Sequence, residues 1–345
     1  MSGIQKSILV VIFLLPFLIC DIINYFSMPE PETIQSRETI LIPRGATLQQ
    51  IADTLAAYQL IRYKNVFISW TIALRYENKL QAGLFTVPHG LNYVQLIYYL
   101  SKPVPEELKV TLIEGWNIDD FAYKLERKLD INAARFIELC HDTAFIRELG
   151  LETNSLIGYL LPETYSFYWG MKEKELIKFL VGRTLKIFDD DSVKRQLAQK
   201  KMTVHQMLTL ASIVEGEAIL DEERPVIASV YYNRLAIGMR LQADPTIQFI
   251  IEGPPRRLLT RDLAVDSPYN TYLYSGLPPG PINNPGKESI LASIYPAQTK
   301  YLYFVADGNG GHIFSRTNAE HARAKAEFDK IRRKVRLQKK LESQN

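Results

Sequence analysis

The sequence predicts an α+β fold in three parts: an N-terminal transmembrane helix, a small β-α module, and a larger mixed α+β domain. Three observations indicate this. The chain opens with an apolar run, a strand–glycine–helix pattern then occurs three times, and amphipathic helices afterwards alternate with short β-rich stretches. With 345 residues, 47% of them hydrophobic, the chain is long enough to build more than one core.

Charge, cysteine spacing and known motifs exclude several classes of function. The net charge is only +3, which gives no indication of a polyanionic partner, so we do not expect the protein to bind nucleic acid. Cys20 and Cys140 lack the spacing of a metal site, and Cys20 lies in the apolar run, which argues against a disulfide. No G-x-S-x-G, H-E-x-x-H, Walker or dinucleotide signature occurs, and histidine is scarce. We therefore expect no metal and no cofactor.

The N-terminal run is predicted to be an uncleaved membrane anchor. Residues 1–6 include Lys6, and residues 7–27 form a mostly apolar segment of about the 20 residues that a bilayer requires. A cleaved signal peptide is the alternative, but no small-x-small cleavage site follows. Lysine before the segment and acidic residues after it predict a cytoplasmic N-terminus, so that the chain beyond the 28–38 linker works outside the membrane.

The strand–glycine–helix pattern defines the next parts of the chain. Its strands and turns fall at Ile40–Gly45, Phe85–Gly90 and Val110–Gly115, each followed by an amphipathic helical segment. The first two units are predicted to form one module over residues 39–103. The third begins a domain over 104–328, and a basic helical tail follows at 329–345. The opening of the first unit resembles LysM-type modules, which bind N-acetylglucosamine polymers; a structural spacer is the alternative.

The most informative helix is predicted at Thr203–Ala218. Thr203 and Gln206 form a capping box, and an apolar stripe then runs along one face and ends at Glu215. Burial among apolar groups favours a protonated carboxyl, which makes Glu215 the candidate proton donor. Glu217 lies about 200° further round the helix and is predicted to point away. An exposed or salt-bridged Glu215 is the alternative.

Aromatic, proline-rich and asparagine-rich stretches elsewhere suggest a cleft that holds sugar. They comprise the loop 155–167, the end of a helix over 225–236, the segment 238–246 and the loops 267–272 and 276–286. Helix capping is the alternative role for the acid before Pro245, and the histidines 205, 312 and 321 are expected to be structural. The candidate substrate-binding residues are Glu163, Tyr165, Asn233, Gln242, Asp244, Tyr269, Asn270 and Tyr272.

One acid on a buried face and an extracytoplasmic cleft fit glycosidic-bond chemistry. Ordinary glycosidases use two carboxyl groups. A lytic transglycosylase needs one, which protonates the leaving oxygen and then takes the proton of the sugar's own 6-hydroxyl. That hydroxyl closes a 1,6-anhydro ring, so no water is consumed.

Several long motifs, in order, resemble the endolytic murein transglycosylases of the MltG/YceG-like family. The likeness extends from the anchor to about His321. Gly216 departs from the family, which usually has a basic residue there. The matching segments are 211–218 (ASIVEGEA), 229–235 (SVYYNRL), 239–246 (MRLQADPT), 267–272 (SPYNTY), 276–286, and 301–306 with His312 and Phe314.

The resemblance implies an enzyme of the inner membrane that cleaves between MurNAc and GlcNAc inside peptidoglycan strands and leaves 1,6-anhydroMurNAc ends. Glu215 occupies the position of the catalytic glutamate. The implied partners are glycan strands, the membrane and, as candidates, peptidoglycan synthases beside which such enzymes limit strand length. Two alternatives stay open: a hydrolase with Glu217, Asp221 or Glu163 as second carboxylate, and a non-catalytic wall-binding scaffold.

Overall fold

The computed structural model describes residues 36–102 and 107–342, with side chains as far as 333. These residues separate into two compact units. The first runs to Lys109 and includes Lys128–Asp130 and Ser166–Met171; the second is the remainder. Within the described ranges, no helix combines the length and apolar character needed to cross a bilayer. The predicted anchor at 7–27 and most of its linker lie outside them.

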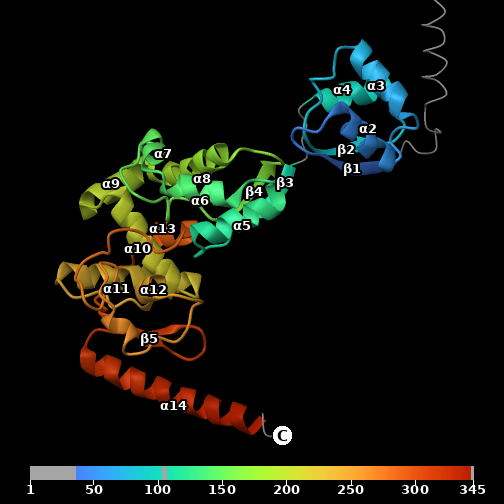
Figure 1. Ribbon diagram of the computed structural model, residues 1–345. Helices are drawn as coiled ribbons and strands as arrows, with labels where there is room; N and C mark the ends of the chain where they lie inside the picture. The colour runs from blue at the N-terminus through green and yellow to red at the C-terminus, as the bar shows by residue number, and fades with distance from the viewer. Residues whose placement is uncertain (1–35, 103–106, 343–345) are drawn as a thin grey trace, which may run out of the picture. The chain divides into compact units, whose positions relative to one another are not determined.

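The first unit pairs two strands and packs three helices against them (Figure 1). β1 (Arg37–Ile42) and β2 (Gly83–Pro88) are antiparallel, with Ile42 opposite Gly83. The helices are α2 (Leu48–Ala57), α3 (Lys64–Ala73) and α4 (Tyr93–Ser101). Capping boxes begin both α2 and α4, which confirms the first two strand–glycine–helix units predicted from the sequence.

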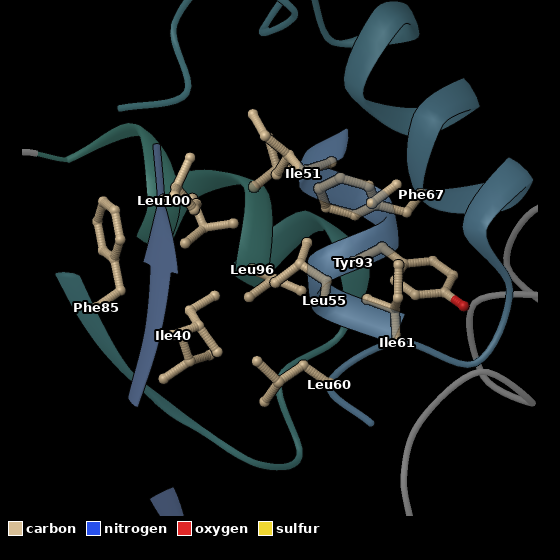
Figure 2. Close-up of a cluster of buried hydrophobic side chains, with 14 residues drawn as sticks. Ile40, Ile51, Leu55, Leu60, Ile61, Phe67, Phe85, Tyr93, Leu96 and Leu100 are labelled. Atoms are coloured by element: carbon tan, nitrogen blue, oxygen red, sulfur yellow. The ribbon is translucent and has the colours of Figure 1, made fainter. Parts of the chain in front are cut away.

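Alternation along the strands produces the core of this unit. Ile40 and Phe85 are buried on the face that meets the helices, where Leu55, Phe67 and Leu96 complete a continuous apolar cluster (Figure 2). The cluster explains why a sheet of only two strands persists: the helices shield one of its faces from water.

From Glu107 onwards the chain is mostly helical, with small sheets, which confirms the mixed α+β class. β3 pairs with β4, and β5 with β6. The strands are β3 (Glu107–Thr111), β4 (Thr164–Tyr168), β5 (Tyr303–Ala306) and β6 (His312–Ser315). The helices are α5 (Ile118–Leu129), α6 (Ala133–His141), α7 (Thr143–Glu148), α8 (Glu173–Phe188), α9 (Asp191–Lys200), α10 (Val204–Glu217), η2 (Asp221–Glu223), α11 (Arg224–Ala236), α12 (Asp244–Ile250), η3 (Asp262–Ala264), α13 (Lys287–Ile294) and α14 (Asn318–Glu342).

Helix α10 is the central element of the second unit. It begins with the predicted capping box of Thr203 and Gln206, and every residue from Met207 to Val214 is buried. It contacts α11, α12 and α13 (Figure 1). The burial extends all round the helix, because α10 has neighbours on every side rather than on one apolar stripe.

The loop 276–286 is held rigidly against this helix. Ser212 Oγ accepts a hydrogen bond from the Ile282 N–H at 3.0 Å. Asn284, which is fully buried, accepts from the Gly158 N–H at 2.8 Å and donates to the Trp116 carbonyl at 3.0 Å. The loop therefore joins α10 to two earlier segments of the chain, despite its high content of proline and glycine.

Gly158 permits one of these contacts. Its φ is +83°, and a Cβ there would lie 2.5 Å from Cβ of Pro281. Gly150 has a similar φ of +75° with nothing within 4 Å, so Gly150→Ala is a matched control. We expect Gly158→Ala to lower the unfolding free energy by about 1–3 kcal/mol more than the control does, as measured by denaturant titration. Equal losses would show that the contact with Pro281 adjusts freely.

Candidate active site

Two carboxyl groups stand at the C-terminal end of α10, on Glu215 and Glu217. Two residues along an α-helix rotate the side chain by about 200°, so the two groups face different neighbours. Since α10 is enclosed, each side chain meets a packed environment, and the environments differ in chemistry.

Glu215 is held in a buried ion pair. Its Oε1 lies 3.1 Å from Nη1 of Arg224, and its Oε2 accepts a hydrogen bond from the Gly286 N–H at 2.9 Å. Its side chain is 6% exposed. The apolar shield predicted for Glu215 is wrong, because a guanidinium and a backbone amide cover the carboxylate. These partners tie α10 to α11 and to the start of α13.

Further acids gather around Arg224. Its Nε lies 2.9 Å from Oδ1 of Asp221, which was one of the predicted second carboxylates. Glu114 lies 3.9 Å from the same guanidinium, and burial, followed by the charge of Glu215, raises the pKa of Glu114. Arg224 is thus the cation that holds these acids together.

Glu217 faces different neighbours from Glu215, as its position about 200° further round the helix predicts. Burial raises the pKa of Glu217 to about 7, and the nearby charge of Asp244 adds to the rise. The hydroxyl of Tyr231 donates to its Oε1 at 3.0 Å and, like the charge of Arg234 and the Asp244 N–H, partly offsets that rise. A substantial fraction of Glu217 is therefore protonated near neutral pH, as a proton donor requires.

Glu217 lines a cavity of about 560 Å³, within the range of small-molecule sites. Three of the predicted substrate-binding residues, Gln242, Asp244 and Tyr272, line it too, and the Tyr272 hydroxyl donates to the Asp244 carboxylate. The other lining residues are Arg234, Tyr303, Phe304, Val305, Ala306, His312, Asn318, His321 and Lys325.

The segment before α12 reaches the cavity through backbone pairing with the loop 267–272. Gln242 has a φ of +48°, rare for a residue other than glycine, and its N–H donates to the Thr271 carbonyl at 3.1 Å. The Ala243 N–H donates to the Thr271 hydroxyl at 2.9 Å. A left-handed residue at a cavity wall suggests a functional constraint on its side chain.

Gly216 brings α12 close to α10. A Cβ at this position would lie 2.6 Å from Cβ of Pro245. The absence of a side chain lets the first turn of α12 approach, and this places the Asp244 N–H on the Glu217 carboxyl. The departure from the family's usual basic residue thus has a packing reason.

Two of the predicted sugar ligands have structural roles instead. Asn233 donates to the carbonyls of Thr299 and Tyr301 at 3.1 and 2.9 Å. Asn270 is fully buried and donates to two carbonyls of the preceding loop at 3.1 and 2.7 Å. Neither residue lines the Glu217 cavity. Satisfying buried backbone carbonyls, which a sequence does not reveal, accounts for both.

Glu163, Tyr165 and Tyr269 do not line this cavity either, so their predicted role in binding substrate stays a prediction. Glu163 pairs with Arg183 at 3.1 Å, and the hydroxyl of Tyr165 donates to the Leu161 carbonyl at 2.8 Å. The ring of Tyr269 packs on Phe249, with centroids 4.9 Å apart.

Tyr231 and Arg234 were not predicted from the sequence, and His312 was expected to be structural. Arg234 is buried and donates to the carbonyls of Leu241 and Leu302, so it links α11 to both flanking loops. The only signal for these residues was their position inside the family-like segments.

A second cavity, of about 840 Å³, lies at the N-terminal end of α10. Lys200, Lys201, Thr203 and His205 line it, together with Tyr232 and Pro279. None of the predicted site residues contributes to it. For metals, no three of the His, Cys, Asp and Glu side chains in the described ranges lie where they could hold an ion.

Comparisons with known proteins agree on one family. The sequence profile of a family described as YceG-like matches residues 40–327. An endolytic murein transglycosylase of Bacillus subtilis is 33% identical over 320 residues, covering 88% of each chain. One from Streptococcus pneumoniae is 30% identical over 84% of this chain and 58% of its own length. A crystal structure of a YceG-like protein from Listeria monocytogenes is 31% identical, with a TM-score of 0.59, over 84% of this chain and 99% of that chain.

The raised pKa of Glu217 predicts how stability depends on pH. The folded protein binds this proton more tightly than the unfolded chain does, so stability falls as pH rises from about 4.5 to about 7. Glu217→Gln removes this loss. We expect the stability of Glu217→Gln relative to the parent to increase by about 1–3 kcal/mol between pH 5 and pH 8, measured by denaturant unfolding.

Glu222→Gln, at an exposed acid of η2, is the control and should show no such change. The same pH dependence in the parent and in Glu217→Gln would contradict the raised pKa.

Proposed function

We propose that this chain, which belongs to the YceG-like family, is an endolytic murein transglycosylase with Glu217 as its proton donor. Its curated relatives carry that name over most of the chain. The observation that supports this assignment of Glu217 is its carboxyl, with a pKa of about 7, in the wall of a cavity that also brings together Gln242, Asp244 and Tyr272. The substrate is peptidoglycan glycan.

The first step is protonation of the glycosidic oxygen. Cleavage between MurNAc and GlcNAc expels the 4-oxygen of GlcNAc, which is a poor leaving group as an anion. The carboxyl of Glu217 gives its proton to this oxygen as the bond to C1 breaks. The hydrogen bonds from Tyr231 and the Asp244 N–H fix the carboxyl and stabilise the carboxylate that remains.

The second step closes the 1,6-anhydro ring. The 6-hydroxyl oxygen of MurNAc bonds to C1 and loses its proton to a base. In the simplest form of the reaction, the carboxylate left on Glu217 takes that proton and is ready for the next cycle. Water is not consumed, and the product is a strand that ends in 1,6-anhydroMurNAc.

Glu215 is the residue to which the sequence assigns catalysis, and that assignment is tested beside Glu217. Both oxygens of Glu215 are already engaged by Arg224 and Gly286. A carboxylate paired in this way suits a role in positioning the end of α10 better than it suits the donation of a proton.

The cellular setting is proposed from the sequence. The apolar segment 7–27 anchors the chain in the inner membrane by a single pass, with the N-terminus in the cytoplasm and the enzyme outside. The module over 39–103 binds glycan in the manner of a LysM-type module. In this setting the enzyme cuts nascent strands beside peptidoglycan synthases and ends their elongation.

Hydrolysis is the second candidate, because Asp244 places another carboxylate in the same cavity as Glu217. Mass spectrometry of the released ends separates the two reactions, since a hydrolysed end carries one added water, about 18 Da.

Paired substitutions identify the proton donor. We expect Glu217→Gln to lower the rate of anhydro-end formation on uncrosslinked strands by about 10²–10⁴-fold, because the amide has no proton to give. Glu215→Gln should retain most of the activity and should lose about 1–3 kcal/mol of stability as its ion pair weakens. The opposite result, with Glu217→Gln active and Glu215→Gln inactive, would restore the sequence-based assignment.

The pH–rate profile gives an independent test. Because the donor must be protonated, we expect kcat to fall about tenfold per pH unit above about 7. The hydroxyl of Tyr231 holds the pKa of Glu217 down, so Tyr231→Phe should move this fall to higher pH. An alkaline limb that does not move in Tyr231→Phe would show that another group limits the rate.

A further inference from the structure

The β5–β6 hairpin brings a histidine to the cavity of Glu217. His312 begins β6, lines this cavity, and has a side chain that is 10% exposed. His312 has no role in the two steps described above.

Glu223 of η2 fixes the imidazole of His312. Its Oε2 lies 2.6 Å from Nδ1 of the ring, and its Oε1 accepts a hydrogen bond from the His312 N–H at 2.8 Å. A carboxylate accepts and cannot donate, so Nδ1 carries the proton and the neutral ring has its lone pair at Nε2. No partner for Nε2 occurs among the residues that the structure describes.

Gly311 makes this pairing possible. A Cβ at Gly311 would lie 3.0 Å from Oε1 of Glu223, a tight contact, so glycine lets the carboxylate approach the hairpin without adjustment. Two bonds from one carboxylate to one residue restrict both the backbone and the ring. This is how a carboxylate prepares an imidazole for proton transfer in hydrolytic sites.

Aromatic rings connect His312 to Glu217. Phe304 is perpendicular to the His312 ring, with centroids 5.2 Å apart, and perpendicular to Tyr231 at 6.0 Å. The hydroxyl of Tyr231 donates to Glu217. The proton donor and the imidazole therefore line the same cavity and are linked through packed aromatic rings.

We propose that His312 is the base that takes the proton of the MurNAc 6-hydroxyl. This rests on the function proposed above. Glu217 gives its proton to the glycosidic oxygen, and the C1–O bond breaks with its electron pair on that oxygen. The 6-oxygen bonds to C1, and its proton moves to Nε2 of His312. Glu217 ends as a carboxylate and His312 as an imidazolium, and solvent returns the proton to Glu217 after the product leaves.

With separate groups for the two proton transfers, no single side chain has to reach both oxygens. A single carboxyl must reach the leaving oxygen and the 6-oxygen in turn, whereas here each group needs only one approach. The other titratable or charged groups of the cavity come from α11, α12, the loop 267–272, β5 and α14. They are Arg234, Asp244, Tyr272, Tyr303, His321 and Lys325.

The test uses His312→Asn in the full chain, with uncrosslinked glycan strands as substrate. The Asn amide nitrogen can occupy the place of Nδ1 and donate to Glu223, so the hairpin contact is kept while Nε2 is lost. We expect kcat for anhydro ends to fall at least about 100-fold, with KM and thermal stability little changed. Glu223→Gln, which loosens the ring, should lower kcat by a smaller factor.

His141→Asn, at an exposed histidine that ends α6, is the matched control and should behave as the parent. A His312→Asn enzyme with the parent's kcat would show that His312 only holds the hairpin, and the inference would fall while the proposed function stands. A parent chain that forms no anhydro ends would overturn both. If Glu217→Gln keeps full activity while His312→Asn loses it, Glu217 is not the proton donor and the assignment of His312 as the base stands.

Discussion

The site depends on the burial of the central turns of α10. Every residue from Met207 to Val214 is buried, so the helix has no solvent face on which an acid could be placed without consequence. Where α10 ends, two carboxyls leave it in different directions. One meets a guanidinium and an amide, and the other meets a tyrosine hydroxyl and a cavity. The chemistry follows from these neighbours: a paired carboxylate is an anchor, while a desolvated carboxyl near neutral pKa is a proton donor.

The segments around that donor are held by buried polar contacts rather than by regular structure. Asn284 joins the 276–286 loop to the turns at Trp116 and Gly158, and Arg234 joins α11 to the loops on either side of it. A buried polar group that loses its hydrogen-bond partner destabilises the fold, so these contacts specify one arrangement of the long loops. A rigid cavity with few mobile parts suits a reaction in which two proton transfers must be aligned with one bond cleavage.

Much of the fold was predictable from the sequence. The strand–glycine–helix units, the capping box of Thr203 and Gln206 and the α+β class all follow from local patterns, and the structure confirms them. The anchor at 7–27 and the LysM-type role of the first module stay predictions. In the site, the predicted residues Gln242, Asp244 and Tyr272 line one cavity, and their role in binding substrate stays a prediction.

The sequence by itself determined the elements, the family and the short segment that carries the reactive acid, because periodicity, capping and motif order are properties of neighbouring residues. Only the tertiary structure decided which of two acids two residues apart has the raised pKa, and which polar residues satisfy backbone carbonyls rather than face a ligand. The reason is that desolvation and ion pairing depend on groups distant in the chain. Arg224 and Gly286 meet Glu215, while Tyr231 and Asp244 meet Glu217.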